Sequence, residues 1–214
     1  TTQIFFKGGD FMSNYVLQVN RVAKPGHSKD VLDLVTTQFE KGSGSRNVSI
    51  SAFASTGSGH LIVGARVLDS IEKVEEIIDN LDREQSDRID SHCNNVQVEM
   101  LRVIEPIENP PSVPKLMARN LFKAKPGKAG ELLSVLLELR SMFPDGVLKP
   151  LITVPYVGDQ DLVRATGIYD SLKSFENHSD LLVEDTFKPY LQKIRDLRES
   201  FIRYTAKITF IRSS

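Results

Sequence analysis

The sequence predicts an α+β fold made of two tandem β-α-β-β-α-β repeats, and three observations lead to this prediction. Short motifs recur at one spacing: Ala23 and Ala124, each before Lys-Pro-Gly, are 101 residues apart, and so are Asp69 and Asp170, each before Ser. A segment with four prolines, residues 105–114, lies between the two copies. Strand-like and helix-like hydrophobic patterns follow one another in the same order in each half. Each half should therefore be one structural unit that buries a face against its copy.

Each repeat begins with an apolar run typical of a strand, at residues 15–22 and 116–122, followed by Lys-Pro-Gly. Proline is tolerated in the first turn of a helix, and glycine permits a sharp change of direction before it. Pro25-Gly26 and Pro126-Gly127 are therefore expected to be structural, and a side chain at either glycine should cost stability if that glycine has positive φ. Apolar stripes at helical spacing follow in both halves. They are Val31, Leu34, Val35 and Phe39, and then Leu132, Val135, Leu136 and Leu139.

Two strand-like runs come next in each half, at residues 48–54 with 60–68 and at 148–157 with 162–169, separated by hairpin loops at 55–59 and 158–160. Ser70 and Ser171 then provide capping residues for a second helix. A final strand is expected at 96–104 and at 204–211. This order is the ferredoxin-like arrangement. The second repeat carries an additional amphipathic stretch, formed by Phe187, Tyr190, Leu191, Ile194, Leu197 and Phe201.

The strands at residues 61–65 and 162–163 are almost continuously apolar. A sheet covered by helices on one side only should alternate, so both faces of these strands need cover. The twin repeat can supply it, which predicts two sheets packed face to face as an α+β barrel within one chain. The expected parts are an arm at 1–12, repeat 1 at 13–104, a proline-rich linker at 105–114 and repeat 2 at 115–214.

Composition excludes several classes of protein. The formal net charge of −1 gives no bulk attraction to nucleic acid or to an anionic membrane, and no apolar run approaches the roughly 20 residues that span a bilayer. Residues 1–12 lack the pattern of a secretory signal. The single cysteine, Cys93, fits a reducing compartment, so a cytoplasmic location is expected. The four histidines share no short ligand spacing, so neither a metal nor another cofactor is expected.

The order of strand, Pro-Gly, amphipathic helix, hairpin and Asp-Ser before a second helix resembles the dimeric α+β-barrel superfamily. The resemblance rests on Lys24-Pro25-Gly26, Lys125-Pro126-Gly127 and the two Asp-Ser pairs, and it covers residues 13–211 as two copies. That superfamily includes antibiotic-biosynthesis-monooxygenase-like and stress-responsive barrel proteins. His178, after Phe175, resembles a histidine often found at this place in monooxygenase-like members.

His178 is the best candidate for a catalytic group. Acidic residues surround it in the sequence, and a carboxylate partner would raise its pKa and fix one tautomer, as a general base requires. The alternative is a histidine on a solvated helix face.

Polar residues interrupt the apolar strands of the second repeat, and these are candidates for substrate binding. Arg119, Asn120 and Arg164 are of this kind, and Tyr169 could line the same space. A buried arginine needs an anionic partner, which could be a substrate carboxylate. A structural ion pair or an exposed strand end is the alternative. Arg119, Arg164 and His178 have no charged counterpart 101 residues earlier, which predicts an asymmetric site in the second half.

Three functions remain open from the sequence. The first is non-catalytic binding of a small hydrophobic or anionic molecule. The second is a cofactor-independent monooxygenase that abstracts a proton from an aromatic or enolisable substrate. The third is a structural or assembly protein with a filled core. The oligomeric state is also open, a homo-oligomer being one alternative. An enclosed pocket that contains His178 or Arg164 would favour the enzyme.

Overall fold

The structure is a computed structural model that describes residues 15–53, 59–80 and 82–212. In the first half, strand β1 (Tyr15–Ala23) leads to helix α1 (Ser28–Lys41), strands β2 (Arg46–Ser51) and β3 (Leu61–Leu68), helices α2 (Ile71–Asp79) and α3 (Arg83–Asp90), and strand β4 (Cys93–Glu105). The second half repeats this order with β5 (Leu116–Ala124), α4 (Ala129–Ser141), β6 (Leu151–Pro155), β7 (Leu162–Tyr169), α5 (Leu172–Leu181), α6 (Lys188–Leu197) and β8 (Arg198–Arg212). The prediction of two repeats of one topology is confirmed, with one further helix in each.

The two Pro-Gly pairs form tight turns with the glycine at positive φ. Gly26 has φ +84° and Gly127 has φ +72°, while the amides of His27 and Lys128 donate to carbonyls three residues earlier. Proline followed by a glycine at positive φ is the pattern of a type II turn. The turns therefore fix the direction in which each first strand passes into its helix.

The expected amphipathic stretch to Phe201 ends earlier than its spacing suggested. Helix α6 stops at Leu197, and Arg198 is already extended, with φ −88° and ψ 145°. Phe201 lies in β8, where its ring is 5.0 Å from the ring of Phe122 in β5. Packing of this aromatic pair on the sheet overrides the helical period. The expected hairpin loop at 55–59 and the arm at 1–12 lie largely or wholly outside the described residues.

The eight strands are hydrogen-bonded in the order β1-β3-β2-β8-β5-β7-β6-β4, which closes into an antiparallel barrel. The predicted fold class is thereby confirmed. The described residues form two compact units, one of residues 103–204 and one of residues 15–102 with 205–212. The limits between the units fall within β4 and β8. The domain limits given by the sequence remain a prediction.

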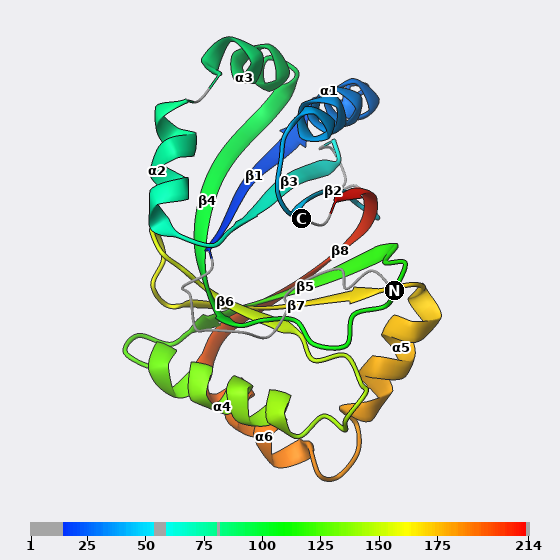
Figure 1. Cartoon of the computed structure of the whole chain (residues 1–214). Coiled ribbons are helices and arrows are strands. Elements are labelled where there is room, and N and C mark those ends of the chain that lie inside the picture. The colour runs from blue at the N-terminus through cyan, green and yellow to red at the C-terminus, as the bar shows by residue number, and fades with distance from the viewer. Residues whose placement is uncertain (1–14, 54–58, 81, 213–214) are drawn as a thin grey trace. The chain divides into compact units, whose positions relative to one another are not determined.

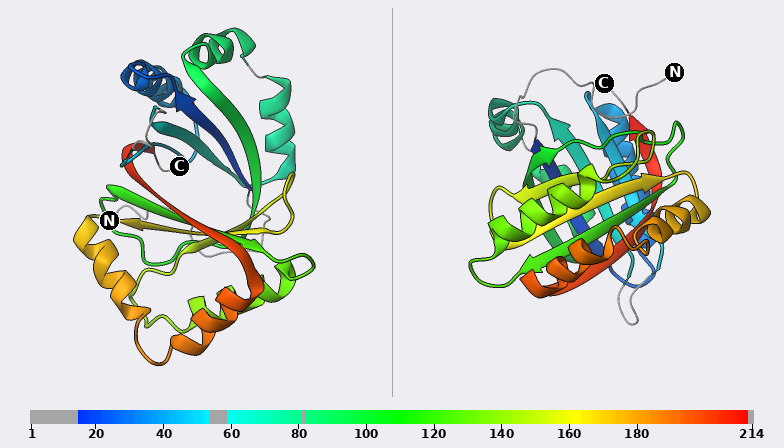
Figure 2. Two further views of the ribbon diagram at one scale, coloured as in Figure 1. Left: turned by 180° about the vertical axis from the view of Figure 1, so that it is seen from behind. Right: turned by 90° about the horizontal axis from the view of Figure 1, so that it is seen from below.

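The unit of residues 103–204 contains a three-helix layer on one side of its strands. Helices α4, α5 and α6 all lie on the same side of β5 and β7 (Figure 1), and the second view of Figure 2 shows α4 and α6 in front of the strands and running roughly along them. The buried core of this layer includes Phe122, Leu132, Ile152, Val163 and Ile194. The register pairs Asn120 with Ala165 and Phe122 with Val163, so these four residues share the face under the helices.

Candidate functional site

A cavity of about 340 Å³ lies between this helix layer and the sheet. Every residue that lines it belongs to the unit of residues 103–204. The buried part of its wall is mostly apolar and includes Leu136, Leu139, Ile152 and Ile194, with Arg140 as a buried charged residue. A pocket of this size with an apolar wall and a few polar groups is typical of a small-molecule site. The cavity counts against a tightly filled core in this unit.

Each of the three helices contributes one stripe to the wall, and each stripe runs to a residue just beyond the end of its helix. The positions are i, i+3, i+4 and i+7, the spacing of one helix face. The stripes are Leu136, Leu139, Arg140 and Phe143 from α4; Phe175, His178, Ser179 and Leu182 from α5; and Leu191, Ile194, Arg195 and Arg198 from α6. The helical periods in the sequence thus determine which side chains reach the cavity.

His178 lies on the inner face of α5, half-buried between two aromatic rings. Its ring stacks on that of Phe143, with centroids 4.8 Å apart and planes 26° apart, and meets the edge of Tyr169 at 5.6 Å. Ser171 caps this helix in a reciprocal capping box with Ser174, which fixes where α5 begins and so which face His178 occupies. The alternative of a solvated helix face is not what the structure shows.

The carboxylate partner expected for His178 is not found among the described residues, and the expected rise of its pKa is wrong. Burial instead lowers the pKa of His178, because the apolar surroundings disfavour the charged ring. The acidic residues near it in the sequence, such as Glu176 and Asp180, are exposed on other faces of α5. His178 is therefore neutral at pH 7 and can accept a proton.

Tyr169 forms part of the cavity wall beside His178. Its ring meets the edge of Phe175 at 5.2 Å, and burial raises the pKa of Tyr169 to about 12 although Arg203 acts in the opposite direction. The hydroxyl thus stays protonated and can donate a hydrogen bond. A Cβ atom at Gly167 would lie 2.4 Å from this hydroxyl oxygen. The glycine therefore provides the space that the phenol occupies.

Asn120 in β5 and Arg203 in β8 form a hydrogen-bonded pair where the strands line the cavity. The Nε atom of Arg203 donates to Oδ1 of Asn120 over 2.7 Å. The guanidinium also lies over the rings of Phe175, at 5.4 Å, and Phe201, at 5.6 Å. Because Oδ1 of Asn120 is occupied, its amide nitrogen is the group that remains to donate to a ligand.

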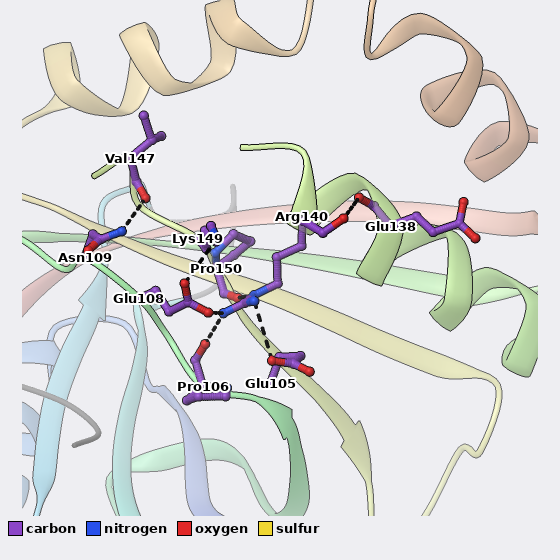
Figure 3. A network of polar contacts seen from close by, with 10 residues as sticks. Glu105, Pro106, Glu108, Asn109, Glu138, Arg140, Val147, Lys149 and Pro150 are labelled. Carbon is purple, nitrogen blue, oxygen red and sulfur yellow. Dashed lines mark hydrogen bonds and ion pairs between the residues drawn. The ribbon is translucent and has the colours of Figure 1, made fainter. Parts of the chain in front are cut away.

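Arg140 also lines the cavity, but its guanidinium binds residues of the proline-rich segment 105–114 (Figure 3). It donates to the carbonyl of Pro150 over 2.9 Å and to the carbonyl of Pro106, and it pairs with Glu108 at 2.8 Å and Glu105 at 3.5 Å. Burial acts against the charge of Glu108, yet the bond and charge of Arg140 lower the pKa of that carboxyl overall. Arg140 therefore anchors the proline-rich segment of residues 105–114 and is not a free anion receptor.

The other two candidates, Arg119 and Arg164, do not line this cavity. Arg119 is opposite Thr166 and Arg164 is opposite Leu121 in the β5–β7 register, so both point to the face of the sheet away from the helices. Both are buried. The structure thus brings together His178, Asn120 and Tyr169 from the set predicted by sequence, and it separates the two arginines from them. A role for Arg119 and Arg164 in ligand binding stays a prediction.

Sequence reasoning missed Phe143, Arg198 and Arg203. A signal existed for Phe143, since it continues the stripe of α4 four residues after Leu139. Arg203 gave no signal of asymmetry, because Arg102 occupies the matching place 101 residues earlier. Within the described ranges, no group of three or more His, Cys, Asp or Glu side chains could hold a metal ion, and no helix is both long and apolar enough to cross a bilayer.

No protein-family model matches the sequence, and no curated protein matches it. Solved structures match over nearly the whole chain. One, from Fusobacterium nucleatum subsp. nucleatum ATCC 25586 and described as a "Putative monooxygenase", has a TM-score of 0.74 at 10% identity and covers 96% of both chains. An anthrone oxidase-like protein has a TM-score of 0.71 at 13% identity, covering 98% of this chain and 96% of that one. The chain has the dimeric α+β-barrel fold.

A third α+β barrel comes from Lactobacillus acidophilus NCFM and carries the same description as the Fusobacterium protein. It matches at a TM-score of 0.69 and 9% identity, with 94% of this chain and 96% of that chain covered. Identities this low establish the fold alone. The chemistry of this α+β barrel must be argued from its own cavity.

Proposed function

We propose that the chain is a cofactor-independent oxygenase of a small phenol or enolisable ketone with an apolar ring body, bound in the cavity beside His178. One observation carries the proposal: a neutral, half-buried imidazole lies in the wall of an apolar cavity, next to a protonated tyrosine. A neutral base and a hydrogen-bond donor together can generate and hold an electron-rich anion.

The steps follow from these groups. His178 accepts a proton from an acidic C–H bond of the substrate, and the resulting enolate oxygen accepts hydrogen bonds from Tyr169 and from the amide of Asn120. Dioxygen takes electrons from the enolate and forms a carbon–oxygen bond, and His178 returns the proton to give a hydroperoxide. Loss of water then breaks the oxygen–oxygen bond and leaves a ketone. A CH₂ group and O₂ thus become a C=O group and H₂O, with no other reductant.

Anthrone is a suitable probe, because its CH₂ group is acidic and because one protein of the same fold is described as anthrone oxidase-like. We expect uptake of dioxygen with formation of anthraquinone. Replacing His178 with Ala should lower kcat/KM by about 10²-fold or more, the usual contribution of a general base. His27→Ala is the matched control, since His27 is a half-exposed histidine outside the cavity. Full turnover in the His178 variant would contradict the proposal.

The pH dependence gives a second readout. Because His178 must be neutral to accept a proton and burial lowers its pKa, the rate should stay level as the pH falls to about 6.5 and decline only below it. A decline that begins well above this pH would point to a different base.

Non-catalytic binding is the second candidate, and the missing carboxylate partner of His178 favours it. Many catalytic histidines are oriented by a second group, and here two aromatic rings do this instead. Saturable binding of anthrone without dioxygen uptake would establish the binding function and exclude the oxygenase.

A further inference from the structure

The rim of the cavity is cationic. Two of the lining residues that are exposed are Arg195 and Arg203, and half-buried Arg198 lies between them in the sequence. No acidic residue is among the described residues that line the cavity. None of these three arginines pairs with a carboxylate of the described chain. An apolar space with several unneutralised guanidinium groups in its wall attracts an anion attached to an apolar body.

Two of these arginines, Arg198 and Arg203, lie against aromatic rings. Arg198 lies 4.9 Å over one ring, that of Phe201, and Arg203 lies over the same ring and that of Phe175. Since Nε of Arg203 is bonded to Asn120, its two terminal nitrogens are the donors left for a ligand. A guanidinium fixed in this way loses little conformational freedom on binding, which favours affinity for an anion.

A structural role for these arginines is the main rival explanation. Arg195 lies in the last turn of α6 and Arg198 directly follows this helix, where cations can offset the partial negative charge of the last carbonyls, whereas Arg203 lies farther along β8. That partial charge is only about half an elementary charge. Moreover, none of the three donates a side-chain hydrogen bond to a carbonyl of α6 within the described structure, and Arg195 reaches only Gln192, at 3.5 Å. Capping of α6 therefore does not account for three guanidinium groups at one opening.

The nearby acid also does not neutralise them. Glu199 follows Arg198 directly, but it acts on Lys123, whose pKa is raised first by the hydrogen bond that Lys123 donates to Asp159 and then by the charges of Asp159 and Glu199. Asp196, the other acidic residue between Arg195 and Arg203, accepts a hydrogen bond from Gln192.

We propose that the ligand of the cavity is an organic anion, an aromatic ring system that bears a carboxylate, with its anionic group on Arg198 and Arg203 and its rings against the apolar wall. This inference deepens the proposed function, because it uses the same cavity and names the class of substrate. The aromatic rings that contact Arg198 and Arg203 would also contact the ligand. The anionic group and the apolar rings of the ligand would therefore be recognised by one set of residues.

Two fluorescent probes with the same ring body test this inference without any turnover. One is 8-anilino-1-naphthalenesulfonate, whose sulfonate stands in for the carboxylate, and the other is neutral N-phenyl-1-naphthylamine. We expect the anionic probe to bind about tenfold tighter or more, and Arg203→Gln to remove most of that preference while the neutral probe changes less than about twofold. Arg198→Gln should act in the same direction.

Arg83→Gln is the matched control, because it removes the same charge from an exposed helix position and should leave both probes unchanged. Raising the salt concentration should weaken only the anionic probe. Equal affinity of the two probes for the unaltered protein, or loss of both probes to the same extent in Arg203→Gln, would overturn the inference. Oxidation of anthrone is measured separately, so failure of anion selectivity and failure of the oxygenase proposal are distinguishable.

Discussion

His178 shows how a single neighbourhood sets the charge of a residue. The folded chain holds the ring neutral through burial, whereas the unfolded chain has the ordinary pKa of about 6.5. As the pH falls below 6.5 the unfolded state binds a proton that the folded state resists. Stability from this group is therefore present above pH 6.5 and is lost as the pH falls through the lower, folded pKa.

We predict that His178→Phe makes the protein less sensitive to acid. Between pH 7.5 and 5.5, the free energy of unfolding should fall less in this variant than in the unaltered chain. The difference is limited to about 1.4 kcal/mol per unit of pKa shift. Urea unfolding at both pH values measures it. Equal losses in the two proteins would show that His178 is solvated in solution.

Gly167 supports a second prediction at this scale. Because a methyl group there would meet the hydroxyl of Tyr169, Gly167→Ala should displace the phenol and cost about 1–3 kcal/mol of stability, with weaker binding of both naphthalene probes. Gly130→Ala is the control: nothing lies within 4 Å of a Cβ atom at Gly130, and alanine is the better helix former. Gly130→Ala should leave stability unchanged or raise it by up to about 1 kcal/mol. Similar losses in both variants would refute the steric argument.

At the scale of elements, the proline-rich segment of residues 105–114 is anchored by one buried side chain, Arg140. Arg140 joins α4 to the carbonyls of Pro106 and Pro150 and to Glu105 and Glu108. Methionine keeps the length of this side chain and removes its donors. We expect Arg140→Met to lower the free energy of unfolding by about 2–4 kcal/mol, because two carbonyls lose their partner. Arg83→Met, on an exposed face of α3, should change it by less than about 0.5 kcal/mol. A loss of similar size in both would contradict the anchor.

The positions of helices, strands and turns were the features that could best be predicted from the sequence. A constant spacing, a Pro-Gly pair and an apolar stripe each depend on neighbours within a few residues, so the turns at Gly26 and Gly127 could be predicted. The pairing of rings around His178 could not, since Phe143 and Tyr169 reach it from α4 and β7 through tertiary packing. The separation of Arg119 and Arg164 from His178 likewise depends on strand alternation in a register that the sequence does not reveal.

At the scale of the whole molecule, the last strand, β8, pairs with β2 of the first half. Its residues 206–212 pair with β2, from Ser51 opposite Ala206 to Arg46 opposite Arg212. A fragment of residues 1–104 would therefore lose the partner of β2 and expose a strand edge, and such edges promote association between chains.

We predict that this fragment aggregates or forms oligomers, and that a synthetic peptide of residues 203–214 reduces the association. Light scattering after size-exclusion chromatography, with and without the peptide, measures both effects. A folded, monomeric fragment would show that the first repeat does not need β8.

The duplication leaves the two halves chemically unequal. At the spacing of 101 residues, Ile77 matches His178, Leu68 matches Tyr169 and Val19 matches Asn120, so aliphatic side chains replace these three polar groups of the cavity wall. A titration should accordingly saturate at a stoichiometry of one ligand per chain, along a hyperbolic isotherm. Although the protein is built from two copies of one unit, each chain would thus have one ligand site. Binding to one half could not then change the affinity of a second site in the other half.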